Sequence, residues 1–302
     1  MTELLVGTST GMRSLNGGGP EPDGGFGPRG VTALAAGDGT MYAIADRRTL
    51  VRRGPDGSWT DLAESTELDL VSVLPARTGV FAGSEEAHLF RLDGEGLEWV
   101  EAFEAVEGRD EWYTPWGGPP AVRSMAADLA GRLHANVHVG GIPRSQDGEQ
   151  WEPTIDIDAD VHQVIGHPNE PDVVLAAGAV GLCVSADGGA TWRTEREGLH
   201  SSYARAVAVA GDTVLLSACT GPHGGRGALY RTGIEPRAGF EKCTDGLPEW
   251  FDGNLDSGWV AASGSDAAFG TPDGEVYRSA DAGARWERVA DDLPTIRALC
   301  FA

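Results

Sequence analysis

The sequence predicts an all-β chain in which seven similar units close into a ring. Three observations support this: 44 glycines among 302 residues, an apolar segment that recurs seven times, and chain ends that each hold part of one unit. The seven segments are GVTALA at Gly30, DLVSVL at Asp69, AVRSMA at Ala121, DVHQVI at Asp160, YARAVA at Tyr203, SGWVAA at Ser257 and TIRALC at Thr295. Their starts lie 37 to 54 residues apart around the closed chain, and such periods match blades of about four strands. We therefore expect residues 1–302 to form one seven-bladed β-propeller with four-stranded blades.

Further strand-like segments follow each start. The second strand reads DVVLAAG, DTVLLSA or DAAFGT, and the third reads GLCVSAD, GALYRTG or GEVYRSAD. The C-terminal TIRALCFA has nothing after it, whereas the N-terminal ELLVGTSTGMRSL supplies a second and a third strand without a first. Pairing of the N- and C-terminal strands would complete one blade and remove an open sheet edge. We expect the ring to close in this way.

The turns after three of the third strands share a motif. SADGGATW at Ser185–Trp192 and SADAGARW at Ser279–Trp286 resemble the Asp-box, S-x-D-x-G-x-T-W, of the BNR-repeat propellers, and SQDGEQW at Ser145–Trp151 is a shorter copy. The resemblance extends over the whole chain and implies a superfamily that includes sialidases, sortilin-like receptors, xyloglucan-degrading enzymes and a photosystem II assembly factor. Aspartate and serine side chains can bind the backbone N–H groups of such turns, so we expect Asp187 and Asp281 to be structural.

Composition excludes several classes of partner. The chain has 46 acidic and 23 basic residues and a net charge of -23, which argues against nucleic acid or an anionic membrane surface. The start MTELLVG lacks a signal-peptide pattern and no apolar run is long enough to span a membrane, so we expect a cytoplasmic protein. The four cysteines lack the spacing of metal ligands, and we expect buried free thiols at Cys183, Cys219, Cys243 and Cys300.

A ring of side chains should surround the mouth of the central channel. The third position of the seven aligned starts is occupied by Thr32, Val71, Arg123, His162, Arg205, Trp259 and Arg297. Three arginines that converge in an acidic protein suggest an anion site, because guanidinium groups match carboxylate or phosphate oxygens in bidentate fashion. The alternative is that the arginines pair with acidic neighbours such as Asp160 or Asp256 and tie the blades together.

Long insertions should decorate the same face as this ring, since they precede first strands or follow second strands. They bring further candidates for the walls of a ligand site: Trp112, Tyr113 and Trp116 in EWYTPWGGPP, Tyr203, and His223 in GPHGGRG. For acid–base chemistry the candidates are His162 and His138, with Asp160 to orient them. Asp156 and Asp158 are expected to be solvated loop residues, and His134 a buried structural histidine.

Two functions are open at this point. The first is a pocket at the channel mouth for a small anionic molecule, in a protein that could be a hydrolase or lyase acting on a carboxylate-bearing or sugar-like substrate. The alternative is a non-catalytic propeller that binds a protein or peptide on the same decorated face. A sialidase is not expected, because sialidases of this superfamily have six blades and an R-I-P motif near the start, whereas GIPRS at 141–145 lies in a third strand.

No motif for a nucleotide, a flavin or a phosphate loop is present. A metal site built from His138, His162, His223 and Asp160 is conceivable, since imidazole and carboxylate groups suit zinc and similar ions. The positive charge of the nearby arginines argues against a cation there, so a metal is the less favoured alternative and no cofactor is clearly implied.

Overall fold

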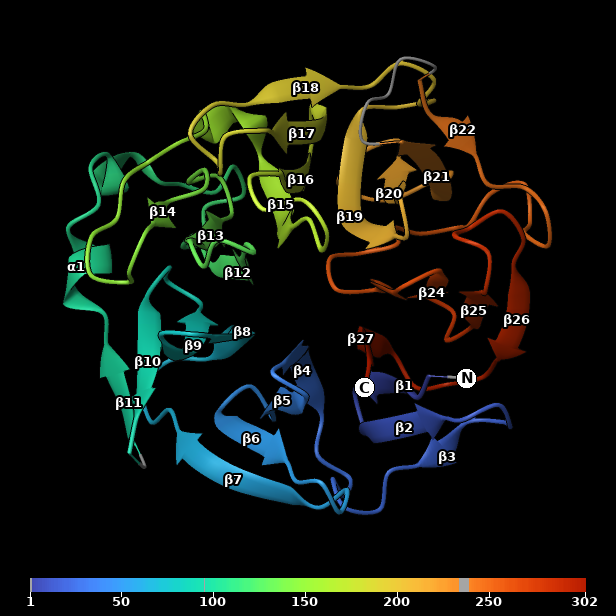
Figure 1. Cartoon of the computed structure of the whole chain (residues 1–302), viewed down its shortest axis with the longest axis horizontal. Coiled ribbons are helices and arrows are strands. Elements are labelled where there is room, and N and C mark those ends of the chain that lie inside the picture. Colours follow the sequence, from blue (N-terminus) through green and yellow to red (C-terminus); the bar gives the residue numbers. More distant parts are fainter. Residues whose placement is uncertain (1, 95, 234–238) are drawn as a thin grey trace.

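Seven antiparallel sheets surround a central channel in the computed structural model, which describes residues 2–94, 96–233 and 239–302 (Figure 1). The fold is a seven-bladed β-propeller, as predicted, and nearly all of its regular structure is β. Helical structure is limited to α1 (Glu101–Glu104) and to two short 3-10 helices, Arg109–Glu111 and Ile157–Ala159. No helix in the described part of the chain is long and apolar enough to cross a membrane.

Each blade begins at the channel and continues outward. Three blades contain β4 (Val31–Gly37), β5 (Thr40–Ala45), β6 (Thr49–Arg53) and β7 (Trp59–Glu64); β8 (Leu70–Ala76), β9 (Gly79–Ser84), β10 (Leu89–Asp93) and β11 (Gly96–Trp99); and β12 (Val122–Ala127), β13 (Leu133–Val137) and β14 (Arg144–Ser145). Two more contain β15 (Val161–Gly166), β16 (Val174–Gly178), β17 (Gly181–Ser185) and β18 (Arg193–Glu195); and β19 (Tyr203–Ala210), β20 (Thr213–Cys219), β21 (Ala228–Gly233) and β22 (Glu241–Lys242). The last two contain β23 (Val260–Ser263), β24 (Asp266–Gly270), β25 (Val276–Ser279) and β26 (Glu287–Ala290); and β27 (Ile296–Phe301), β1 (Leu4–Thr8), β2 (Gly11–Leu15) and β3 (Glu21–Pro22).

The fourth strand is reduced in the blade that begins with β12. Its outermost pairing is a single bridge between Arg144 and Glu152, whose backbone groups exchange hydrogen bonds of 2.8 and 2.9 Å. Pro143 and Pro153 flank this pair. Proline has no N–H group to donate to a ladder, so the pairing cannot extend.

The ring closes through the two chain ends. Strand β27 lies innermost and pairs with β1, with Leu4 opposite Phe301 and Val6 opposite Leu299. All four side chains are buried in one apolar cluster. Figure 1 shows these strands next to each other near the labels N and C, which confirms the predicted closure.

The turns after β17 and β25 bear out the structural role expected for their aspartates. Asp187 Oδ1 accepts hydrogen bonds from the backbone N–H groups of Ala190 and Thr191 at 3.0 and 2.9 Å. Asp281 Oδ1 accepts one from the backbone of Arg285 at 2.9 Å. These interactions engage the side chains within their own turns, away from the channel.

The cysteines are free, as predicted. Cys183, Cys219 and Cys243 are buried and Cys300 is partly buried. Burial raises the pKa of Cys183 and Cys243 to about 11, so both are thiols at neutral pH.

Candidate binding site at the channel mouth

The predicted ring of side chains is positioned by β-bulges. In β4, β8, β12, β15 and β27 the register of the ladder shifts at the ring residue, and in β19 it shifts at Arg205 and Ala206. A bulge bends its strand and re-aims a side chain that regular alternation would direct elsewhere. The ring position of the remaining blade, Trp259, directly precedes β23. Six of the seven ring residues thus owe their direction to an irregularity of the strand.

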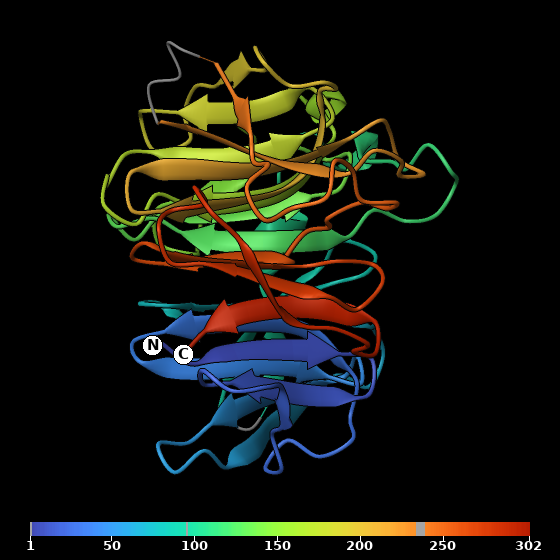
Figure 2. The ribbon, with the colours of Figure 1, turned by 90° about the vertical axis from the view of Figure 1, so that its right-hand side faces the viewer.

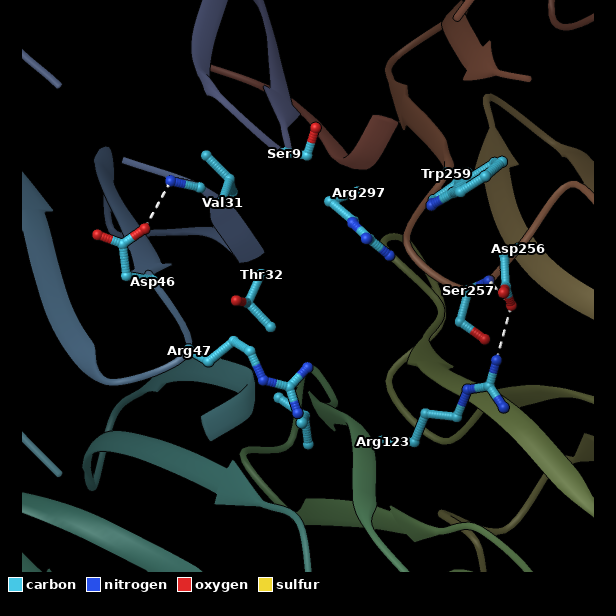
Figure 3. A pocket seen from close by; sticks show the side chains of 12 residues that line it. Ser9, Val31, Thr32, Asp46, Arg47, Arg123, Asp256, Ser257, Trp259 and Arg297 are labelled. Carbon is cyan, nitrogen blue, oxygen red and sulfur yellow. Dashed lines mark hydrogen bonds and ion pairs between the residues drawn. The ribbon is translucent and has the colours of Figure 1, made fainter. Parts of the chain in front are cut away.

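A cavity of about 470 Å³ lies at this end of the channel. Five ring residues line it, namely Thr32, Val71, Arg123, Trp259 and Arg297, together with Ser9, Gly30, Val31, Asp46, Arg47, Asp256 and Ser257 (Figure 3). The lining comes from the starts of first strands, from the connections that lead into them and from turns between second and third strands, so the cavity opens on the face predicted from the insertions. In Figure 2 the ring of blades is seen edge-on, and the green connection before β12 extends beyond the blades on one side.

Two of the three ring arginines share one carboxylate. Arg123 Nη2 lies 2.7 Å from Asp256 Oδ1, and Arg205 Nη1 lies 3.2 Å from the same oxygen. Burial alone would raise the pKa of Asp256, but the two guanidinium groups outweigh it and hold the pKa below its ordinary value. Arg123 and Arg205 therefore match the alternative stated above, in which arginines tie blades together.

The third ring arginine differs from the other two. Arg297 is exposed in the cavity and makes no hydrogen bond or ion pair with the described residues. Figure 3 shows its side chain extending toward the middle of the cavity, whereas a dashed line joins Arg123 to Asp256. The positive charge of Arg297 is thus available to a ligand.

Sequence reasoning missed Arg47, which lines this cavity together with Arg123 and Arg297. Arg47 lies in the turn between β5 and β6 with a positive φ of 62°, and its guanidinium pairs with Asp69 at 2.6 Å and with Glu85. Arg47 belongs to a turn between second and third strands, whereas the candidates came from the aligned first strands and the long insertions. Because both partners are acidic, Arg47 adds little net charge.

His162, Asp160 and His138 come together beside the cavity. His162 Nε2 lies 3.6 Å from Asp160 Oδ2, and His138 Nε2 lies 3.3 Å from Asp160 Oδ1. Asp160 lies in the left-handed region, with φ 45°, at the end of the 3-10 helix, and this bend directs its carboxylate toward both rings. His138 directly follows β13 of the neighbouring blade, so the three residues join two blades.

His162 is fully buried, and the other two residues are partly exposed. Its Nδ1 lies 2.6 Å from the carbonyl oxygen of Ala204, which can only accept, so Nδ1 carries the hydrogen. Burial, followed by the positive charge of Arg123, lowers the pKa of His162 to about 3. Burial would raise the pKa of Asp160, but the nearby imidazole of His138 and the positive charge of Arg123 lower it. At neutral pH a neutral imidazole therefore faces a carboxylate.

The predicted aromatic walls are dispersed. Tyr203 packs on His162 with ring centroids 4.8 Å apart, and Trp116 lies 4.9 Å from the ring of His138. Trp116 and Tyr113 are 63% and 47% exposed, whereas Trp112 packs on Phe103 in the core of its blade. Of the predicted aromatic walls, only Trp259 lines the cavity.

The other histidines and aspartates considered in the sequence analysis lie apart from this group. His223 is exposed in its loop and does not belong to the group formed by His138, Asp160 and His162. His134 is buried, with Nε2 3.3 Å from Asp128 Oδ2. Its place in the core is the structural one predicted for it. Asp156 and Asp158 are exposed, as expected.

Comparisons with known proteins identify the fold. No protein family and no curated protein matches the chain. Among solved structures, an ancestral GH74 enzyme is 14% identical with a TM-score of 0.65, over 97% of this chain and 40% of that one. The virginiamycin B lyase of Staphylococcus aureus is 12% identical with a TM-score of 0.61, over 97% of this chain and 90% of that one. YCF48 bound to D1 peptide is 14% identical with a TM-score of 0.55, over 97% of this chain and 89% of that one.

The chain spans less than half the length of each of three GH74 enzymes that it resembles. At identities this low a likeness establishes the fold and leaves function to the site itself. On these comparisons and its own sheet topology, the chain has the fold of the seven-bladed β-propellers.

Proposed function

We propose that this protein binds a small anionic molecule, one that carries a carboxylate or phosphate group, in the cavity at the channel mouth. The observation that carries the proposal is the unpaired guanidinium of Arg297 in a cavity of about 470 Å³. Sites for small ligands are commonly about 300 to 1,000 Å³ and hold a few convergent polar groups. Arg297 would contact the anionic group directly.

Other lining residues would complete the site. Arg123 uses one nitrogen for Asp256, and a guanidinium has five N–H donors, so further donors can face a ligand. Ser257 and Thr32 add hydroxyl groups, and Trp259 provides an apolar wall. Arg123, Arg205 and Asp256 together carry one net positive charge near the cavity, and this charge would also attract an anion.

The test begins with thermal melts of the parent protein against carboxylates, phosphate and sulfate. The best ligand is then titrated calorimetrically into the parent and into Arg297→Ala. Loss of one charge-assisted contact worth about 1.5 to 3 kcal/mol should weaken binding about ten- to a hundredfold, while stability stays within about 0.5 kcal/mol because Arg297 has no partner to lose.

Arg285→Ala is the matched control. Arg285 is also an exposed arginine, but it lies in the turn after β25 and its side chain is outside the cavity. Arg285→Ala removes the same charge as Arg297→Ala and should leave the affinity for the anion unchanged. The proposal is wrong if none of the anions raises the melting temperature of the parent, or if both variants weaken binding equally.

A second candidate is a protein or peptide with an acidic or C-terminal carboxylate group. It is favoured by the exposure of Trp116 and Tyr113, at 63% and 47%, in one connection on the same face. Exposed aromatic side chains are frequent anchors of protein interfaces. A propeller of similar fold, YCF48, was solved bound to the D1 peptide. Binding of acidic peptides that is lost in Trp116→Ala, with small anions inactive, would favour this candidate.

A further inference from the structure

A set of buried polar atoms beside the cavity has no partner. His138 Nε2, Asp160 Oδ1 and His162 Nε2 are buried and make no hydrogen bond with the described residues. Buried polar groups are nearly always satisfied, and each exception calls for an explanation. Here three exceptions, from two neighbouring blades, face one another.

Asp160 Oδ1 is an acceptor, and the orientation of the His162 ring leaves its Nε2 without a protein partner. The hydrogen of the His162 ring is on Nδ1, where it is donated to the carbonyl oxygen of Ala204 at 2.6 Å. Nε2 of the same ring faces the carboxylate of Asp160, 3.6 Å away, and has no hydrogen-bond partner. A positive species between the ring and the carboxylate, a proton or a metal ion, would satisfy both groups.

We infer that His138, Asp160 and His162 form a binding site for a divalent transition-metal ion of the zinc type. Two imidazole nitrogens and a carboxylate oxygen are a ligand set that zinc and similar first-row ions prefer. A backbone carbonyl that accepts the Nδ1 hydrogen, as Ala204 does for His162, is the usual outer partner of a metal-bound histidine.

The spacing fits this interpretation. Ligands at about 2.0 to 2.1 Å from a tetrahedral ion lie about 3.3 to 3.4 Å from one another. The nitrogen-to-oxygen distances here are 3.3 Å from His138 to Asp160 Oδ1 and 3.6 Å from His162 to Asp160 Oδ2, so each imidazole faces a different oxygen of the carboxylate. One ligand atom from each residue lies within 4.8 Å of the others, so the most widely separated pair would have to approach by up to about 1.4 Å to reach the tetrahedral spacing. No other such trio of histidine, cysteine or acidic residues occurs among the described residues.

The structure removes part of the objection drawn from the sequence, that arginines would repel a cation, although the charge of Arg123 still acts on His162. Arg123 and Arg205 are both paired with Asp256, and the free arginine, Arg297, belongs to β27 in another blade. Asp160 is 25% exposed at its side chain, so an ion can reach the site, while His162 lies beneath it at 0%. Three protein ligands would leave a fourth position open for water or another small ligand.

The site does not depend on the proposed anion pocket, and its residues do not line the cavity that contains Arg297. It assigns the three residues to metal coordination in place of the acid–base role expected from the sequence. Arg297→Ala should leave metal affinity unchanged, so the two proposals can fail separately.

The experiment is a titration of chelator-treated protein with Zn²⁺ against a chromophoric chelator. We expect one tight equivalent in the parent. Asp160→Asn is the decisive variant, because asparagine tolerates the φ of 45° at this position and keeps the size of the side chain but loses the charge. Loss of an outer partner of a metal site costs about 10- to 100-fold in affinity, so loss of this ligand should cost about a hundredfold or more.

His138→Ala should weaken Zn²⁺ binding to a similar extent, and His223→Ala, which alters an exposed histidine outside the trio, should not. Circular dichroism of the metal-free variants shows whether they fold. In the parent, Co²⁺ should give the intense visible absorption of a four- or five-coordinate site. The inference is wrong if the parent binds Zn²⁺ no more tightly than Asp160→Asn, or if His223→Ala weakens binding as much as His138→Ala does.

Discussion

Replacement of Asp256 by asparagine should destabilise the channel mouth, because two guanidinium groups depend on one carboxylate. Arg123 and Arg205 each lie within 3.2 Å of the same oxygen, so their nitrogens are no more than about 6 Å apart. At an effective dielectric constant of about 20, two like charges at this distance repel by about 3 kcal/mol. The Asp256 side chain is 34% exposed, and solvent will screen part of this. We expect Asp256→Asn to lower the free energy of unfolding by about 2 to 3 kcal/mol.

Urea denaturation followed by circular dichroism measures the free energy of unfolding of the parent and of Asp256→Asn. Urea is suitable because it adds no salt that would screen the charges. Asp273→Asn is the matched control, because Asp273 is exposed and has no hydrogen bond or ion pair with the described residues. Removal of one arginine should relieve the repulsion, so the double variant Asp256→Asn with Arg123→Gln should recover to within about 1 kcal/mol of the parent. The reasoning is refuted if Asp256→Asn and Asp273→Asn are equally stable, or if the double variant is the least stable of all.

Two further predictions concern stability. Burial would raise the pKa of Asp128, but His134 and Arg132 lower it to about 2; this carboxylate should stabilise the fold by about 2 kcal/mol above pH 4 and lose that contribution between pH 4 and 2. Asp128→Asn should therefore be less stable at pH 5, by urea titration, and the difference should disappear near pH 2; a difference independent of pH would contradict this. Deletion of residues 295–302 removes β27, whose Ile296, Leu299 and Phe301 are buried, and should abolish cooperative thermal unfolding. A shortened chain that melts in one sharp transition would show that β1 does not need this strand.

Much of the fold could be predicted because a repeat carries its information locally. The apolar starts of the seven units recur in the sequence, and the two incomplete ends complement each other, so the pairing of β1 with β27 followed without knowledge of distant contacts. The exception is also local in origin. The fourth strand of the blade that begins with β12 is cut short by Pro143 and Pro153, and the period of the repeat does not reveal this effect of proline on the ladder.

The sequence predicted which residues lie at the site, but not which of them form ion pairs with one another. The aligned third position identified five residues that line the cavity, although the bulges that direct their side chains depend on partner strands and leave no pattern in the sequence. The sequence also could not predict which aspartate forms an ion pair with which arginine. Arg123 and Asp256 are 133 residues apart, and only the closed ring brings them to 2.7 Å.

This pairing determines the chemistry that each side of the channel mouth can support. Had Asp160 paired with an arginine, as the sequence also allowed, its carboxylate would have been satisfied and the two histidines would have faced a neutral ion pair. Because Asp256 takes both Arg123 and Arg205, Asp160 is left to His138 and His162, and Arg297 is left without a carboxylate. The same distribution of charges thus leaves a cation facing the cavity and three buried polar atoms without hydrogen-bond partners beside it. Asp256→Asn should therefore alter both places at once, whereas Arg297→Ala and Asp160→Asn should each alter only one.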